Sequence, residues 1–86
     1  MNDSSRSTLE FCLEFVKGHA DSASQRTQCR TWIKTAITTV KSEDLGAADF
    51  IISELSAIDN YLSGADGSMT SVDVLTKIDT VMQLLG

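Results

Sequence analysis

Two cysteines and one histidine carry the most reactive side chains of this chain. Cys12 and Cys29 lie in apolar stretches, without a CxxC pair or the Cys/His spacing of a zinc site. A catalytic cysteine needs a base and a group that orients that base. His19 stands alone at the end of a predicted helix, which is weak support for such an arrangement. We therefore expect no catalytic residue, no metal and no cofactor.

The two thiols allow two interpretations. In the first, Cys12 and Cys29 are reduced and buried, and act as small hydrophobic side chains. In the second, they face each other across a turn near residues 20–21 and form a disulfide or take part in redox chemistry. A small thiol redox protein is therefore one alternative function.

A row of basic residues gives the other alternative. Arg26, Arg30 and Lys34 follow one another at intervals of four, a pattern with which a helix contacts phosphate groups. The whole chain, however, has 12 acidic and 7 basic residues and a net charge of −5, which opposes binding to nucleic acid or an anionic membrane. We expect the acidic helix that follows to pair with this row, and keep a nucleic-acid-associated regulator as the alternative.

Aromatic residues flank the predicted core. Phe11 and Phe15 lie one helical turn apart beside an apolar stripe, and Trp32 has a similar place on the next helix. Such rings either complete the core or form a contact patch, because aromatic side chains are enriched at the centres of protein interfaces. The second helix also carries an uncharged ridge, which is either a contact surface for another chain or an ordinary solvent-exposed face, formed by Thr27, Thr31, Thr35 and Thr38.

Hydrophobic periodicity and capping patterns predict four helices, at about 8–19, 22–41, 43–62 and 71–85, after a flexible segment 1–6. The first and last begin at capping boxes, Ser7-Thr8-Leu9-Glu10 and Thr70-Ser71-Val72-Asp73. The third is expected to begin after an N-cap in Ser42-Glu43-Asp44. No segment shows the sustained alternation of a strand, so we expect a single all-α domain over residues 1–86. The short connections favour a small antiparallel bundle of about four helices, and completion of its core by dimerisation stays open.

Size and the N-terminal sequence narrow the functional classes. A core built from 86 residues leaves little room for a large pocket, so we expect neither an enzyme nor a small-molecule substrate. The N-terminus lacks the basic and apolar regions of a signal peptide, and no apolar run is long enough to cross a bilayer. We expect a cytoplasmic protein without a membrane partner.

These observations favour an acidic protein-binding module that occludes or bridges a partner protein, of the inhibitor, regulator, adaptor, immunity-protein or chaperone type. A homodimer is the alternative assembly. The candidate partner-binding residues are Phe11, Phe15, Arg26, Arg30, Thr31, Trp32 and Lys34.

Overall fold

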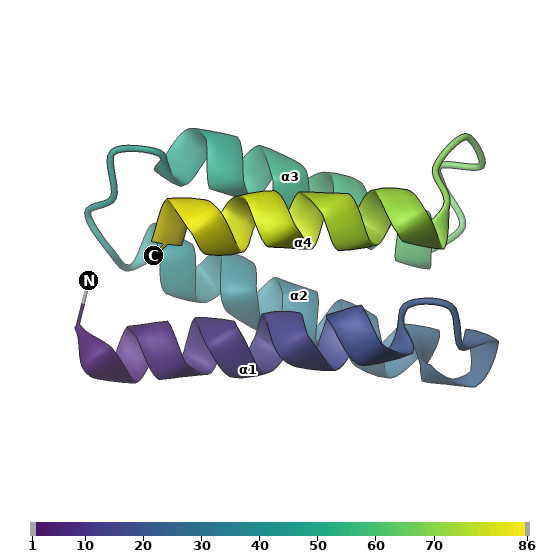
Figure 1. The fold of residues 1–86 in the computed structure, drawn as a ribbon, viewed down its shortest axis with the longest axis horizontal. Coiled ribbons are helices and arrows are strands. Elements are labelled where there is room, and N and C mark those ends of the chain that lie inside the picture. Colours follow the sequence, from purple (N-terminus) through teal and green to yellow (C-terminus); the bar gives the residue numbers. More distant parts are fainter. Residues whose placement is uncertain (1, 86) are drawn as a thin grey trace.

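The computed structural model describes residues 2–85, which form four α-helices and no β-strand. The helices are α1 (Asp3–His19), α2 (Arg26–Lys41), α3 (Ala48–Leu62) and α4 (Ser71–Leu85), and a short 3₁₀ helix, η1 (Ala23–Gln25), precedes α2. Consecutive helices run antiparallel (Figure 1). The predicted fold class, a small all-α antiparallel bundle, is confirmed.

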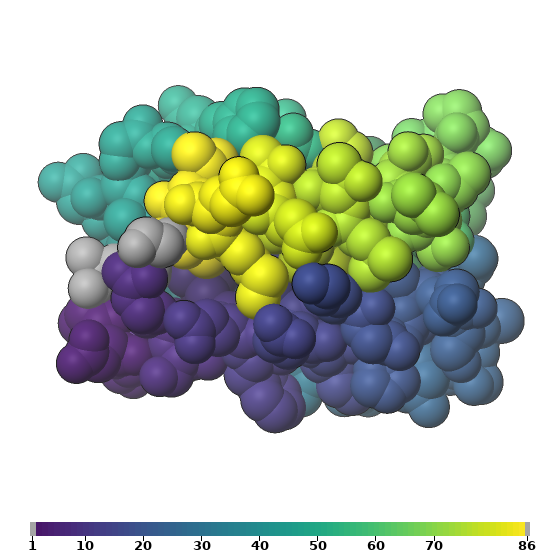
Figure 2. All heavy atoms as spheres, viewed as in Figure 1, coloured from purple at the N-terminus to yellow at the C-terminus, as the bar shows by residue number. Residues whose placement is uncertain are grey.

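Each helix packs against two neighbours. α1 contacts α2 and α4, and α3 contacts the same two helices from the opposite corner of the bundle. The chain returns to its start, so that α1 and α4 lie side by side along one face (Figures 1 and 2). The outer surfaces of the α1–α2 pair and of the α3–α4 pair therefore lie on opposite sides of the molecule.

An aliphatic core fills the space between the helices. Each helix contributes one buried stripe at intervals of three and four residues, as the periodicity of its sequence requires. None of the buried side chains within residues 2–85 is polar or charged. The stripes are Leu9, Cys12, Leu13 and Val16; Cys29, Ile33, Ala36 and Val40; Ile51, Leu55, Ile58 and Leu62; and Val74, Ile78, Val81 and Leu85.

The first helix begins earlier than the sequence predicts. Asn2 is its N-cap, and the Asn2 Oδ1 atom accepts a 2.7 Å hydrogen bond from the backbone N–H of Ser5. The expected capping box at Ser7 therefore lies inside α1, and residues 3–6, expected to be flexible, are helical. Met1 lies outside the described residues.

The third helix begins later than predicted. The hydroxyl of Ser42 donates backwards to the carbonyl oxygen of Thr39 at 2.7 Å, so it ends α2 instead of starting α3. Leu45 then packs against the core, which holds the connecting segment over the end of the bundle until α3 begins at Ala48. The expected N-cap in Ser42-Glu43-Asp44 is therefore wrong.

The other two helix starts lie closer to the expected positions. The sequence predicts the second helix from about residue 22, and in the structure its first turn is the 3₁₀ helix η1, with α2 proper beginning at Arg26. α4 covers the expected range. Thr70 and Asp73 form its capping box, with the Thr70 N–H donating to Asp73 Oδ2 at 3.0 Å and the Asp73 N–H donating to Thr70 Oγ1 at 3.3 Å.

Candidate functional site

The carboxylate, ammonium and guanidinium groups of α1 all lie on one stripe of that helix. Two of them contact α4: Lys17 forms a 3.0 Å ion pair with Asp79, and Arg6 donates to the carbonyl oxygen of Leu85 at 2.7 Å. The stripe therefore borders α4 and faces away from α2. Its members follow one another at intervals of three and four residues: Asp3, Arg6, Glu10, Glu14 and Lys17.

The charged residues of α2 form a second stripe, beside α3. Arg30 Nε lies 3.0 Å from Asp59 Oδ1, and the guanidinium of Arg26 lies over the ring of Tyr61, 5.1 Å from its centroid. Lys34 and Lys41 continue the stripe at helical spacing and are exposed. The expected pairing between the basic second helix and the acidic third helix is therefore present in the structure.

These two stripes leave the remaining side of the α1–α2 pair without charge. We call this surface the α1–α2 face. Within residues 3–41, neither helix places a carboxylate, ammonium or guanidinium group there. Asp21 lies beyond their end, in the turn that joins them. The face consists of Thr8, Phe11, Phe15 and Gly18 of α1 and of Gln28, Thr31, Trp32 and Thr35 of α2.

Three aromatic rings lie at the middle of the α1–α2 face. Phe11 is 56% exposed, yet its ring packs edge-on against the Trp32 ring with a centroid distance of 4.9 Å and an interplanar angle of 77°. The Phe15 ring lies 6.1 Å from Trp32 and stacks on His19 at 4.2 Å. Such edge-to-face and stacked pairs stabilise each other beyond simple burial. Phe11 is therefore an exposed ring that is in contact with a half-buried one.

Hydrogen bonds hold the polar groups next to these rings. His19 Nδ1 lies 2.7 Å from the Phe15 carbonyl oxygen, and because a carbonyl oxygen only accepts, this nitrogen carries the proton. The Trp32 Nε1 atom is buried without a hydrogen-bond partner among the described residues. Since that N–H is already buried, a partner that covers the face causes no further desolvation of it.

The threonines of α2 bond to their own helix. Thr31 Oγ1 donates to the carbonyl oxygen of Thr27 at 3.2 Å, and Thr35 Oγ1 donates to that of Thr31 at 3.1 Å. Thr39, which lies outside the predicted ridge, bonds to Thr35 in the same way at 2.9 Å. Because these hydroxyl protons are already used, the α1–α2 face can be covered at a small cost in lost hydrogen bonds to water.

The predicted partner-binding residues do not all lie on one surface. Phe11, Phe15, Thr31 and Trp32 come together on the α1–α2 face. Arg26 and Arg30 turn towards α3, and Lys34 lies exposed between the two surfaces. The sequence analysis did not predict that the whole α1–α2 face lacks charge. The spacing of the charged residues in α1 could have indicated it, because that spacing places them all on one other side of the helix.

Both thiols are buried and free. Cys12 and Cys29 have no exposed surface, and burial raises the pKa of each thiol above its usual value of 9.0. Only the thiolate is a good nucleophile or metal ligand, so both groups are protonated and unreactive at neutral pH. This environment suits the interpretation of the cysteines as small hydrophobic side chains.

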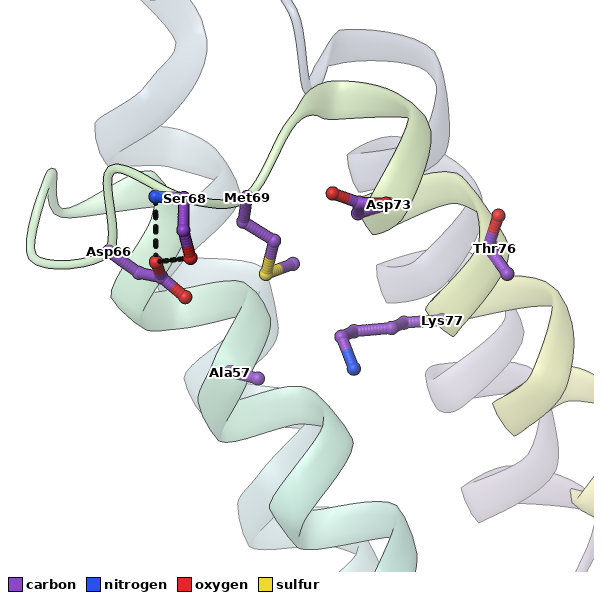
Figure 3. A pocket seen from close by; sticks show the side chains of 7 residues that line it. All are labelled: Ala57, Asp66, Ser68, Met69, Asp73, Thr76 and Lys77. Carbon is purple, nitrogen blue, oxygen red and sulfur yellow. Dashed lines mark hydrogen bonds between the residues drawn. The ribbon is translucent and has the colours of Figure 1, made fainter.

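An open groove of about 440 Å³ lies between α3, α4 and the loop that joins them. Figure 3 shows the side chains of Met69 and Lys77 reaching towards the same space. Two polar groups of the groove already have partners. Lys77 forms a 2.6 Å ion pair with Glu54, and Asp66 accepts hydrogen bonds from Ser68 N (2.9 Å) and Ser68 Oγ (2.6 Å). These bonds lower the pKa of Asp66.

Neither a metal centre nor a membrane span is found in residues 2–85. Within this range no three His, Cys, Asp or Glu side chains gather closely enough to hold a metal ion. None of the helices in the same range has the length and apolar character needed to cross a bilayer. Comparison of the chain with protein-family models, with curated protein sequences and with solved structures finds no match.

Proposed function

We propose that this chain is a small protein-binding module that covers a surface of a partner protein with its α1–α2 face. One observation carries the proposal: the Phe11 ring is exposed, contacts Trp32, and belongs to a face without carboxylate, ammonium or guanidinium groups. Aromatic anchors of this kind dominate binding at the centres of protein interfaces, where charged residues are depleted. The face therefore has the composition of an interface centre.

The state of the face before binding also supports the proposal. The Phe11 and Trp32 rings already contact each other, so little side-chain freedom remains to be lost on association. The Thr31 and Thr35 hydroxyls have partners within α2, so a partner surface need not replace their hydrogen bonds. A module of this kind acts by occlusion or bridging, as an inhibitor, regulator, adaptor, immunity protein or chaperone does. The two unpaired thiols fit the reducing cytoplasm.

The two alternative functions gain no comparable support. A nucleic-acid-associated regulator needs its arginines free to meet phosphates, whereas Arg26 and Arg30 contact Tyr61 and Asp59. A thiol redox protein needs an accessible thiolate, whereas both cysteines are buried. Protein binding through the α1–α2 face is therefore the function that the geometry supports best.

Matched pairs of variants test the proposed function. Phe11→Ser removes the central ring, and Phe50→Ser removes a ring of similar exposure (49% against 56%) from α3. Thr31→Glu places a charge on the face, and Thr76→Glu places one on α4, where Thr76 bonds to the Val72 carbonyl as Thr31 does to that of Thr27. We expect Phe11→Ser and Thr31→Glu to weaken partner association at least about tenfold, and their controls to leave it unchanged.

The readout is quantitative affinity capture from cell extract with each immobilised variant, after circular dichroism has shown unchanged helix content. A protein retained by the two controls and lost by both face variants supports the proposal. Equal retention by Phe11→Ser and Phe50→Ser, with all variants folded, contradicts it.

A further inference from the structure

We infer that the α1–α2 face binds a second copy of this chain, in a two-fold dimer in which α1 of each copy packs on α2 of the other. This inference rests on the proposed function and names its partner. The uncharged centre of the face is the first reason. In a two-fold dimer both copies contribute the same surface patch. A patch whose centre carries charges of one sign therefore brings like charges together. The α1–α2 face avoids this repulsion.

The charges at the two edges of the face then select one dimer geometry. Two identical faces can meet about a two-fold axis that runs either along the helices or across them. An axis across the helices places α2 on α2 and brings two basic edges together, in which Lys34 and Lys41 are exposed and Arg26 and Arg30 lie against α3. An axis along the helices places α1 on α2 instead.

The favoured arrangement pairs edges of opposite charge. At the α1 edge, Arg6 and Lys17 contact α4, and the exposed carboxylates of Glu10 and Glu14 lie between them in the sequence. In the α1-on-α2 dimer this acidic edge lies along the basic edge of the second copy. Lys34 is the exposed cation at the middle of that edge. Complementary edges of this kind favour one register and oppose the alternatives.

The order of the residues along the helices is compatible with this pairing. A two-fold axis along the helices keeps each residue at its own height. Because α1 and α2 are antiparallel, residue 10 and residue 34 are displaced from the Phe11–Trp32 ring contact in the same direction, by one and by two residues. Glu10 and Lys34 of the second copy therefore lie on the same side of that contact.

The face is also large enough for a stable dimer. The bundle measures 33 × 20 × 18 Å, so one whole side offers roughly 600 Å² before side-chain relief is counted, which is the lower end of what each partner buries in a standard interface. The dimer would form a second four-helix core from α1 and α2 of both copies.

Charge reversal and mixing test the dimer. Lys34→Glu sets Glu10 and Glu14 against a third carboxylate, and the double variant Glu10→Lys/Glu14→Lys sets Lys34 against two ammonium groups. We expect either change alone to raise the dimer dissociation constant by roughly tenfold or more. An equimolar mixture of the two proteins should associate again, because each interface edge then pairs opposite charges. The control is Asp49→Lys, which reverses the charge of an exposed residue on α3 and should leave dimerisation unchanged.

Sedimentation velocity over about 1 μM to 1 mM measures these constants, a range that covers weak and moderate dimers. A wild-type monomer throughout overturns the inference but leaves the proposed function standing, since the face variants are still tested by capture of another protein. A dimer insensitive to Lys34→Glu and to Phe11→Ser also overturns it, because association then uses another surface. Failure to restore association on mixing contradicts the α1-on-α2 arrangement.

Discussion

Cys12 and Cys29 show how strongly burial governs single residues in this molecule. Burial in an apolar environment disfavours the charged thiolate, and this raises the pKa of both thiols above 9.0. We expect the folded protein at pH 8 to react with a disulfide reagent such as dithionitrobenzoate at least ~100-fold more slowly than the protein unfolded in guanidinium chloride. Equal rates in the two states would contradict the buried position of the thiols.

The same two residues predict how stability depends on alkaline pH. Well below pH 9 both thiols are protonated in the folded and the unfolded state, so they add no pH dependence. As pH rises through and above 9, the unfolded state loses these protons first, and the free energy of unfolding falls. Urea titrations of the wild type and of Cys12→Ala/Cys29→Ala at several pH values measure this, and the variant should lose part of the decline.

Single residues also show where sequence reasoning reaches its limit. Helical periodicity places Phe11 and Phe15 beside the core stripe, but their relative exposure depends on the neighbouring helix. In the fold, Phe15 fits between His19 and Trp32, whereas Phe11 reaches Trp32 only with its edge and stays exposed. The sequence pattern could therefore predict both rings as interface residues, but it could not show which of the two is exposed.

At the scale of the helices, the apolar pattern predicted which segments are helical more reliably than the residue at which each helix begins. The apolar stripe of α1 begins at Leu9, so periodicity gave no signal for the polar residues 3–8. Residues 7–10 fit a capping box, yet Asn2 caps the helix, and the third residue after it is Ser5 instead of the glutamate of that motif. For α4 the capping box and the apolar stripe begin together, and the start follows from sequence.

A contact with the other end of the chain helps to hold the early start of α1. Arg6 donates to the carbonyl oxygen of Leu85 at 2.7 Å, which ties the first turns of α1 to the end of α4. This bond joins residues 79 positions apart, so local sequence patterns could not predict it.

Two substitutions distinguish the observed start of α1 from the expected one. Asn2→Ala removes the Asn2 side chain that accepts from the Ser5 N–H, and we expect it to lower the free energy of unfolding by about 1 kcal/mol. Ser7→Ala changes an exposed residue inside the helix, where alanine is the better helix former, so we expect a gain of a few tenths of a kcal/mol at most. Urea denaturation followed by circular dichroism measures both, and a loss of about 1 kcal/mol for Ser7→Ala would show that Ser7 caps the helix.

At the scale of the whole molecule, the four helices are not equally well packed. α2 approaches α1 and α3 more closely than α4 approaches either of its own neighbours. The buried stripes of α1 and α2 include the small side chains of Cys12, Cys29 and Ala36, and small side chains between helices permit a close approach. Three surface hollows of the described chain all border α4, two beside α1 and one beside α3.

This unequal packing predicts the order in which the bundle opens. We expect the amides of α4 to exchange with solvent through a partial opening whose free energy lies about 1–2 kcal/mol below that of global unfolding, while the amides at the centre of α2 exchange only through global unfolding. Native-state hydrogen exchange at several low denaturant concentrations separates the two classes. Ile78→Val, in the core stripe of α4, should lower the free energy of both openings, by about 0.5–1.5 kcal/mol. Equal protection of α2 and α4 in the wild type would instead show that all four helices unfold as one unit.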